Sequence, residues 1–122
     1  MLLNNFYKIL ELHSEDGEII KAKIEINSNH EIFSGHFPNN PIVPGVCLIQ
    51  IVKETLSKHL GKELTLAEGK NIKFTAVVNP NEYKQLEVEH ILKSTENGIF
   101  RVNSKIFNLD TIFLKFQGSF RS

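Results

Sequence analysis

The stretch GVCLIQIVKETLSKHLG (residues 45–61) decides the fold, because its apolar residues do not alternate with polar ones as they do in most of the chain. It holds good helix formers. Pro44 suits the position just before a first helical turn, and Gly61 suits the position after a last one. The first half is apolar on nearly every side, which is typical of a helix enclosed by other structure. We therefore expect one buried helix here.

The two segments before the helix show the period-two pattern of half-buried β-strands. In EIIKAKIEI (residues 18–26), isoleucine and alanine side chains face one way, and lysine and glutamate side chains face the other. The preceding FYKILEL (residues 6–12) predicts another strand, and HSEDGE (residues 13–18) predicts the turn between them. The two strands are expected to form a hairpin.

Four more strands are predicted after the helix. They are NIKFTAVV (71–78), KQLEVEHIL (84–92), IFRVNSKIF (99–107) and TIFLKFQGSF (111–120). In the last of them, Ile112, Leu114 and Phe116 are expected to share one face. An order of two strands, a long loop, one helix and four strands favours the α+β class, with a mainly antiparallel sheet of about six strands wrapped around the central helix.

The composition limits the function. A chain of 122 residues with 41% apolar residues suits one domain, residues 1–122. Fourteen basic residues balance fourteen acidic ones, so we expect neither nucleic acid nor a membrane as a partner. The single cysteine, Cys47, cannot form an intrachain disulfide and is expected to be a small buried apolar residue. The N-terminal residues do not resemble a signal peptide, and we expect a cytoplasmic protein.

The loop before the helix, GHFPNNPIVP (residues 35–44), holds the candidate catalytic residue His36. Three prolines spaced by three fix φ along this loop and hold His36 in a preorganised position. The loop leads into the helix start, where the backbone N–H groups of Gly45 and Val46 have no intrahelical acceptor. Gly45 has no side chain to block an incoming group, so a carbonyl oxygen could be polarised there. A histidine base beside such donors suits proton abstraction next to a carbonyl.

The run GHFPNNPIVPGVCLIQ (residues 35–50) resembles the signature of the 3-hydroxyacyl-acyl carrier protein dehydratases of fatty acid synthesis. The resemblance implies a hot-dog fold, a curled antiparallel sheet around a central helix. It implies elimination of water from a 3-hydroxyacyl thioester to give the trans-2-enoyl thioester, with no metal and no cofactor. It also implies that an acyl carrier protein delivers the substrate. The expected assembly is a homodimer or a trimer of dimers, whose sites combine the histidine of one subunit with the acid of the other.

The same resemblance implies roles for individual residues. His36 is the base and proton carrier, and the N–H group of Gly45 holds the thioester carbonyl. Phe37, Pro44 and Val46 belong to the surface that binds the acyl chain.

The sequence departs from the family at Gln50, where the family has a carboxylic acid that protonates the leaving hydroxyl. An amide can hydrogen-bond this hydroxyl but cannot act as an acid in the same way. Three accounts remain open. His36 performs both proton transfers while Gln50 orients the hydroxyl, or Glu54 substitutes from one helical turn away, or a different hot-dog subunit supplies the acid in a heterodimer.

Two rival functions follow from the same position. The chain could be a catalytically weak or inactive hot-dog subunit that pairs with an active homologue, or it could be a hot-dog thioesterase. A thioesterase needs an acid or base to direct water at the thioester, and Gln50 offers neither. The two enzymes differ in product, because only a thioesterase releases free thiol.

Arg101 and Lys105 share one face of a predicted strand and could dock an acidic acyl carrier protein. The alternative is an ordinary solvated outer face of the sheet. The histidines outside the loop share no metal-ligand spacing, so no metal site is expected.

Overall fold

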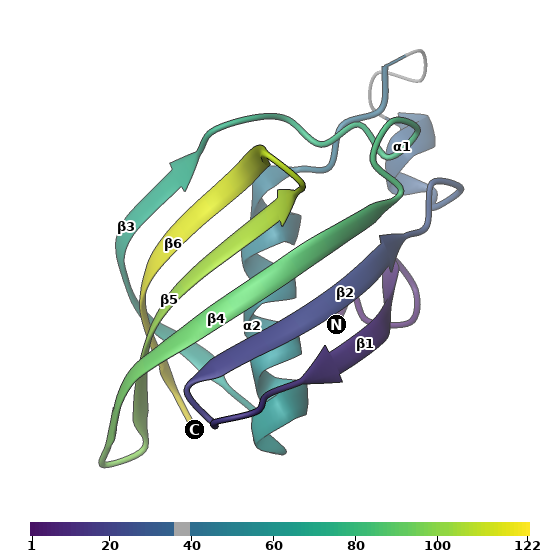
Figure 1. Ribbon diagram of the computed structural model, residues 1–122. Coiled ribbons are helices and arrows are strands. Elements are labelled where there is room, and N and C mark those ends of the chain that lie inside the picture. The colour runs from purple at the N-terminus through teal and green to yellow at the C-terminus, as the bar shows by residue number, and fades with distance from the viewer. Residues whose placement is uncertain (36–39) are drawn as a thin grey trace.

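A computed structural model describes residues 1–35 and 40–122. Its elements are β1 (Tyr7–His13), β2 (Ile19–Ile26), α1 (Ile32–Gly35), α2 (Gly45–Leu60), β3 (Thr65–Phe74), β4 (Gln85–Glu96), β5 (Ile99–Asn108) and β6 (Thr111–Arg121). The strands form one sheet in the order β1-β2-β4-β5-β6-β3, and each pairing is antiparallel. The sheet lies in front of α2 in Figure 1 and curls around it.

This architecture confirms the predicted α+β class and the hot-dog fold: a six-stranded antiparallel sheet, curled but not closed, with one main helix. The core lies between the two, where apolar side chains of the inner sheet face meet α2. No helix among residues 1–35 and 40–122 is long and apolar enough to cross a membrane.

Helix α2 begins directly after Pro44 and ends where the sequence places Gly61, as predicted. Gly61 has φ 66°, a left-handed conformation that glycine adopts without strain, and its N–H group donates to the carbonyl of Ser57. The buried apolar residues of this helix are Cys47, Leu48, Ile51, Val52 and Leu56. Burial raises the pKa of the Cys47 thiol, and the predicted role of Cys47 as a small buried apolar residue is confirmed.

The third strand differs from the predicted range 71–78. β3 begins at Thr65 and ends at Phe74, and it pairs with β6 along its length. Residues 65–70 are exposed and show no apolar alternation, so periodicity alone does not reveal them. Residues 65–70 form a strand because they pair with β6, and not because they have a buried face.

In β6 the prediction that Ile112 shares a face with Leu114 is wrong. Ile112 lies opposite Phe107 and Leu114 lies opposite Ile106, so Phe113 is an extra residue between them. Such a bulge turns the residues before it to the other face of the sheet. Leu114 and Phe113 are fully buried, whereas Ile112 is only partly buried.

A polar contact joins the helix to the sheet inside this core. The ring of His90 (β4) is fully buried, with its Nε2 atom 2.8 Å from Thr55 Oγ1 (α2) and its Nδ1 atom 2.7 Å from Ser104 Oγ (β5). The hydroxyl of Thr55 donates to the carbonyl of Ile51, so it accepts from His90 Nε2–H, and Nδ1 accepts from the Ser104 hydroxyl. Burial, with a smaller effect of His59, lowers the pKa of His90 to about 3. The imidazole is therefore neutral and serves as a structural link.

Candidate active site

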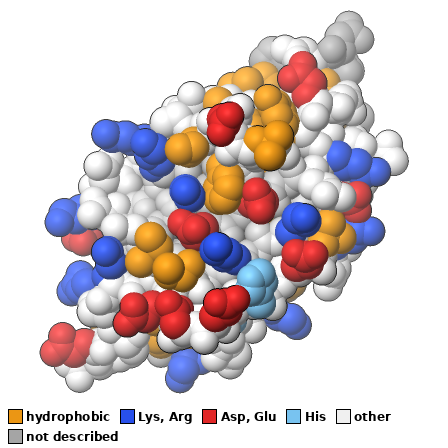
Figure 2. Space-filling view, viewed as in Figure 1, with side chains coloured by type: hydrophobic (Ala, Val, Ile, Leu, Met, Phe, Trp, Pro, Cys, Tyr) orange, Lys and Arg blue, Asp and Glu red, His pale blue; other side chains and the backbone are white. Residues whose placement is uncertain are grey.

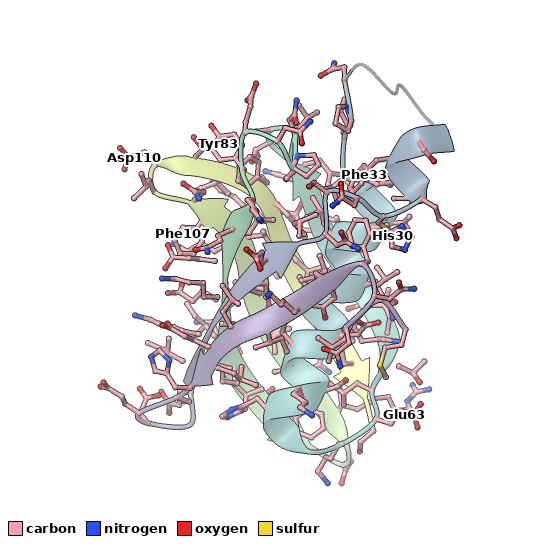
Figure 3. All side chains as sticks on the ribbon, turned by 90° about the vertical axis from the view of Figure 1, so that its right-hand side faces the viewer. His30, Phe33, Glu63, Tyr83, Phe107 and Asp110 are labelled. Atoms are coloured by element: carbon pink, nitrogen blue, oxygen red, sulfur yellow. The ribbon has the colours of Figure 1, made fainter. Side chains whose placement is uncertain are left out.

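Both sides of the loop that carries His36 are anchored in described structure. On the N-terminal side, Phe33 of α1 is buried with its ring 5.5 Å from that of Phe6, and the ring of His30 packs edge-on against Phe6 at 5.3 Å (Figure 3). On the C-terminal side, the backbone N–H group of Val43 donates to the carbonyl of Val78 at 2.9 Å. The chain is therefore anchored on both sides of residues 36–39.

The start of α2 presents backbone donors. Pro44 has the extended ψ of 143° and makes no side-chain cap. Its carbonyl accepts from the N–H groups of Cys47 and Leu48. Among the described residues, the N–H groups of Gly45 and Val46 make no backbone hydrogen bond. These N–H groups lie at the positive end of the helix dipole, which suits the oxygen of a polarised carbonyl.

The ring of Phe74, the last residue of β3, lies directly over Gly45. A Cβ atom on Gly45 would lie 2.8 Å from Cζ of Phe74, which is closer than real Cβ contacts allow. A side chain at position 45 would therefore have to displace the ring of Phe74, which is the end of a half-exposed side chain. The Phe74 side chain contacts Gly45 and is itself 51% exposed, so its ring lies between Gly45 and the solvent.

One turn further along α2, Gln50 is held by Glu54. The Nε2 atom of Gln50 donates to Oε2 of Glu54 at 2.5 Å. The Glu54 carboxylate is only 5% exposed and also accepts from the backbone N–H groups of Leu2 and Leu3, at 2.9 Å each, and from the hydroxyl of Tyr7 at 3.0 Å. Four groups thus donate to one buried carboxylate.

All four groups that hydrogen-bond to the Glu54 carboxyl group are donors, so both of its oxygens act as acceptors. Burial, and then the negative charge of Glu54, raise the pKa of the Tyr7 hydroxyl, so Tyr7 remains a donor. This arrangement argues against Glu54 as the substitute acid, because both carboxylate oxygens already bind groups of the protein.

The same contact orients the amide of Gln50. Its NH₂ group faces Glu54, because the amide oxygen in that position would be repelled by the carboxylate. The oxygen Oε1 makes no hydrogen bond to any described side chain or backbone group. It is therefore the end that can accept a hydrogen from a bound hydroxyl group.

The structure brings together Pro44, Gly45 and Val46 at the start of α2, with Gln50 on the same helical face as Val46. Val46 is 72% exposed, so its side chain is open to a ligand or to another subunit. His36 and Phe37 lie outside the described residues. The catalytic and binding roles of all these residues stay predictions.

Residues 12–109, about four fifths of the chain, match the sequence model of the family described as ApeI-like, ApeI dehydratase. The chain belongs to this ApeI-like dehydratase family. The relatives of the chain include proteins named 3-hydroxyacyl-acyl carrier protein dehydratase FabZ, among them those of Pediococcus pentosaceus and Levilactobacillus brevis. That of Pediococcus pentosaceus is 33% identical over 109 residues, covering 80% of this chain and 73% of the relative. That of Levilactobacillus brevis is 30% identical over 116 residues, covering 86% and 78%.

Solved structures show that this ApeI-like chain shares its fold with proteins of several descriptions. The dehydratase heterocomplex ApeI:P of Xenorhabdus doucetiae matches with a TM-score of 0.72 at 15% identity, covering 93% of this chain and 96% of that one. A putative thioesterase, yhdA of Lactococcus lactis, matches with a TM-score of 0.66 at 9% identity, covering 96% and 93%. At these identities the likeness establishes the fold alone.

Two features of the site in this member of the ApeI-like family do not follow from the sequence. One is Phe74, which lies in the predicted strand but gives no sign of reaching Gly45 across the fold. The other is the cluster of donors around Glu54, whose members Leu2, Leu3 and Tyr7 are 47 to 52 residues away in the sequence. Only the Gln50–Glu54 spacing of four on a predicted helix was a usable signal.

Proposed function

We propose that the chain is a 3-hydroxyacyl-acyl carrier protein dehydratase. It eliminates water from a 3-hydroxyacyl thioester to give the trans-2-enoyl thioester, in the cytoplasm, in fatty acid or polyene-type lipid synthesis. The observation that carries the proposal is the helix start, where the donors of Gly45 and Val46 lie one turn from the oriented amide of Gln50. Relatives named FabZ support the same reaction and an acyl carrier protein as the carrier of the substrate.

In the proposed reaction, the N–H group of Gly45 holds the thioester carbonyl and so stabilises the negative charge that develops on its oxygen. His36 removes the proton from C2, and the resulting imidazolium returns it to the hydroxyl group on C3. The C3–O bond breaks and water leaves. Oε1 of Gln50 accepts the hydrogen of that hydroxyl beforehand and fixes its direction. No cofactor or metal takes part in these steps.

A second candidate is a weak or inactive subunit that is completed by an acid-bearing homologue in a heterodimer. The observation that favours it is the engagement of Glu54, which leaves this chain's helix without an unoccupied carboxylate near Gln50. A solved protein of the same fold is described as a dehydratase heterocomplex. A homodimer or a trimer of dimers is the assembly expected for the first candidate. A thioesterase is less favoured, because no such carboxylate directs a water molecule.

The deciding experiment measures hydration of a trans-2-enoyl thioester on acyl carrier protein by mass spectrometry, for the wild type and for His36→Ala. Turnover by the wild type that His36→Ala abolishes supports the dehydratase. If the wild type is inactive alone and turnover appears on adding an acid-bearing homologue, the heterodimer is supported instead. Release of free thiol without hydration would identify a thioesterase.

The proposed docking of the acyl carrier protein at Arg101 and Lys105 rests on two residues in different situations. Arg101 is exposed on β5. Lys105 already lies 3.8 Å from a carboxylate oxygen of Glu89 and 4.7 Å from the ring centre of Phe107. Charge reversal at both residues should weaken binding of the carrier protein if they dock it.

A further inference from the structure

Three lysines lie side by side across three neighbouring strands, on the outer face of the sheet that points away from α2. Lys105 of β5 is directly opposite Lys115 of β6, which is directly opposite Lys73 of β3. We refer to these three residues as the lysine row. Side chains directly opposite one another in an antiparallel pair are close neighbours, and like charges in this position destabilise the sheet.

The other half of the same face arranges its charges differently. Lys8 of β1 lies opposite Glu25 of β2, with 3.0 Å between Nζ and a carboxylate oxygen. Lys23 of β2 lies between Glu11 of β1 and Glu87 of β4. Figure 2 shows acidic and basic side chains intermixed over the face turned to the viewer. On β1, β2 and β4, cross-strand partners thus neutralise one another.

The lysine row lacks this neutralisation. Glu89 approaches Lys105 at 3.8 Å, but Lys73 and Lys115 form no ion pair within residues 1–35 and 40–122. Lys73 and Lys115 are also exposed. An anionic group from outside the chain would therefore relieve a repulsion that the sheet itself leaves in place.

A hollow of about 470 Å³ lies beside the lysine row. Its lining includes the three lysines and the next row of side chains, Asn71, Gln117 and Asn103, which are again cross-strand partners. Lysine and amide side chains together supply several hydrogen-bond donors to an acceptor placed there. Ile91, Ile112, Phe116 and the acidic Glu89 also line the hollow, so a docked partner would meet apolar surface beside the donors of the lysine row.

We propose that the lysine row docks a partner protein through acidic side chains on one face of a helix. Adjacent strands are about 4.8 Å apart, so the row spans about 10 Å. Acidic residues at positions i, i+4 and i+7 of a helix span about 10.5 Å along its axis and match this length. A single phosphate group is too short to reach all three lysines. A second copy of the same face would bring like charges together.

The position of the row connects it to the candidate site. Lys73 immediately precedes Phe74, and successive residues of a strand point to opposite faces. The row therefore ends at Lys73 on the outer face of β3, next to Phe74, whose side chain points to the inner face and contacts Gly45. The inference rests on the docking part of the proposed function. It moves the centre of the docking surface from Arg101 to Lys115. It does not depend on whether the chain turns over a substrate.

The test uses a fluorescein-labelled, alanine-rich helical peptide with glutamate at i, i+4 and i+7, and its glutamine counterpart, followed by fluorescence anisotropy at low salt. The variant Lys73→Gln/Lys115→Gln should bind the glutamate peptide at least about fivefold more weakly than the wild type. The control variant Lys8→Gln/Lys23→Gln removes the same charge from the neutralised half of the face. It should bind the peptide as the wild type does.

Three results would overturn the inference. They are an equal loss of binding in both double variants, equal binding of the glutamine peptide, and displacement of the peptide by inorganic phosphate at the same concentration as by unlabelled peptide. The first would indicate a response to net charge alone, and the last a site for single anions. Because the assay needs no substrate, any of these results would leave the dehydratase proposal standing, and loss of turnover would leave the docking inference standing.

Discussion

The 2.5 Å contact between Gln50 Nε2 and Glu54 Oε2 makes position 50 sensitive to its chemical identity. Gln50→Glu would place two carboxylates within hydrogen-bond distance, and like charges so close raise the pKa of the pair until one proton is shared. In the folded state this pair would bind a proton more tightly than in the unfolded state, so its contribution to stability is lost as pH rises. We expect Gln50→Glu to lower the melting temperature, relative to the wild type, much more at pH 8 than at pH 5.

The matched control for this prediction exchanges the two groups. Gln50→Glu/Glu54→Gln keeps one carboxylate and one amide in contact, so most of the loss at pH 8 should disappear. Thermal unfolding at both pH values, followed by circular dichroism, measures the effect. A penalty of the same size at pH 5 and pH 8 would mean that the two carboxylates do not interact. Appearance of hydratase activity in Gln50→Glu would in addition show that the site accepts an acid at this position.

At the scale of the strands, the lysine row predicts that one charge reversal stabilises the protein. Lys115→Glu would place a carboxylate between Lys73 and Lys105, turning two repulsive cross-strand pairs into attractive ones. We expect the melting temperature to rise by about 2–5 °C, since each pair contributes up to about 1 kcal/mol. Lys23→Glu, between Glu11 and Glu87, is the matched opposite and should lower the melting temperature. A lower melting temperature for Lys115→Glu would contradict the repulsion.

The strands and the helix also show how far the sequence predicts this structure. The helix follows from residues 45–61, because the loss of alternation and the terminal Gly61 are local signals. The first part of β3 and the bulge at Phe113 do not follow, because pairing with a distant strand decides them. For the site, Gly45 and Gln50 were found from a motif, whereas Phe74 reaches the helix start only through the curl of the sheet.

At the scale of the whole molecule, the helix and the sheet are joined in the core through His90, and this predicts how the protein responds to acid. The pKa of His90 is lowered to about 3 by burial, whereas an unfolded histidine has a pKa of about 6.5. The unfolded state therefore binds the proton first as pH falls. The stability contributed by the neutral ring is complete above about pH 6.5 and is lost progressively below it.

We expect the free energy of unfolding to fall by about 3 kcal/mol between pH 7 and pH 4 from this residue alone. Protonation would also turn Nδ1 into a donor facing the Ser104 hydroxyl, which donates to it in the neutral state. Urea unfolding across this pH range, for the wild type and for His90→Gln, separates this effect from that of other titrating groups. His90→Gln should be less stable at pH 7, because the amide fills less of the buried site, but its stability should change less with pH. If the free energy of unfolding fell equally with pH in both proteins, protonation of His90 would not cause the loss of stability.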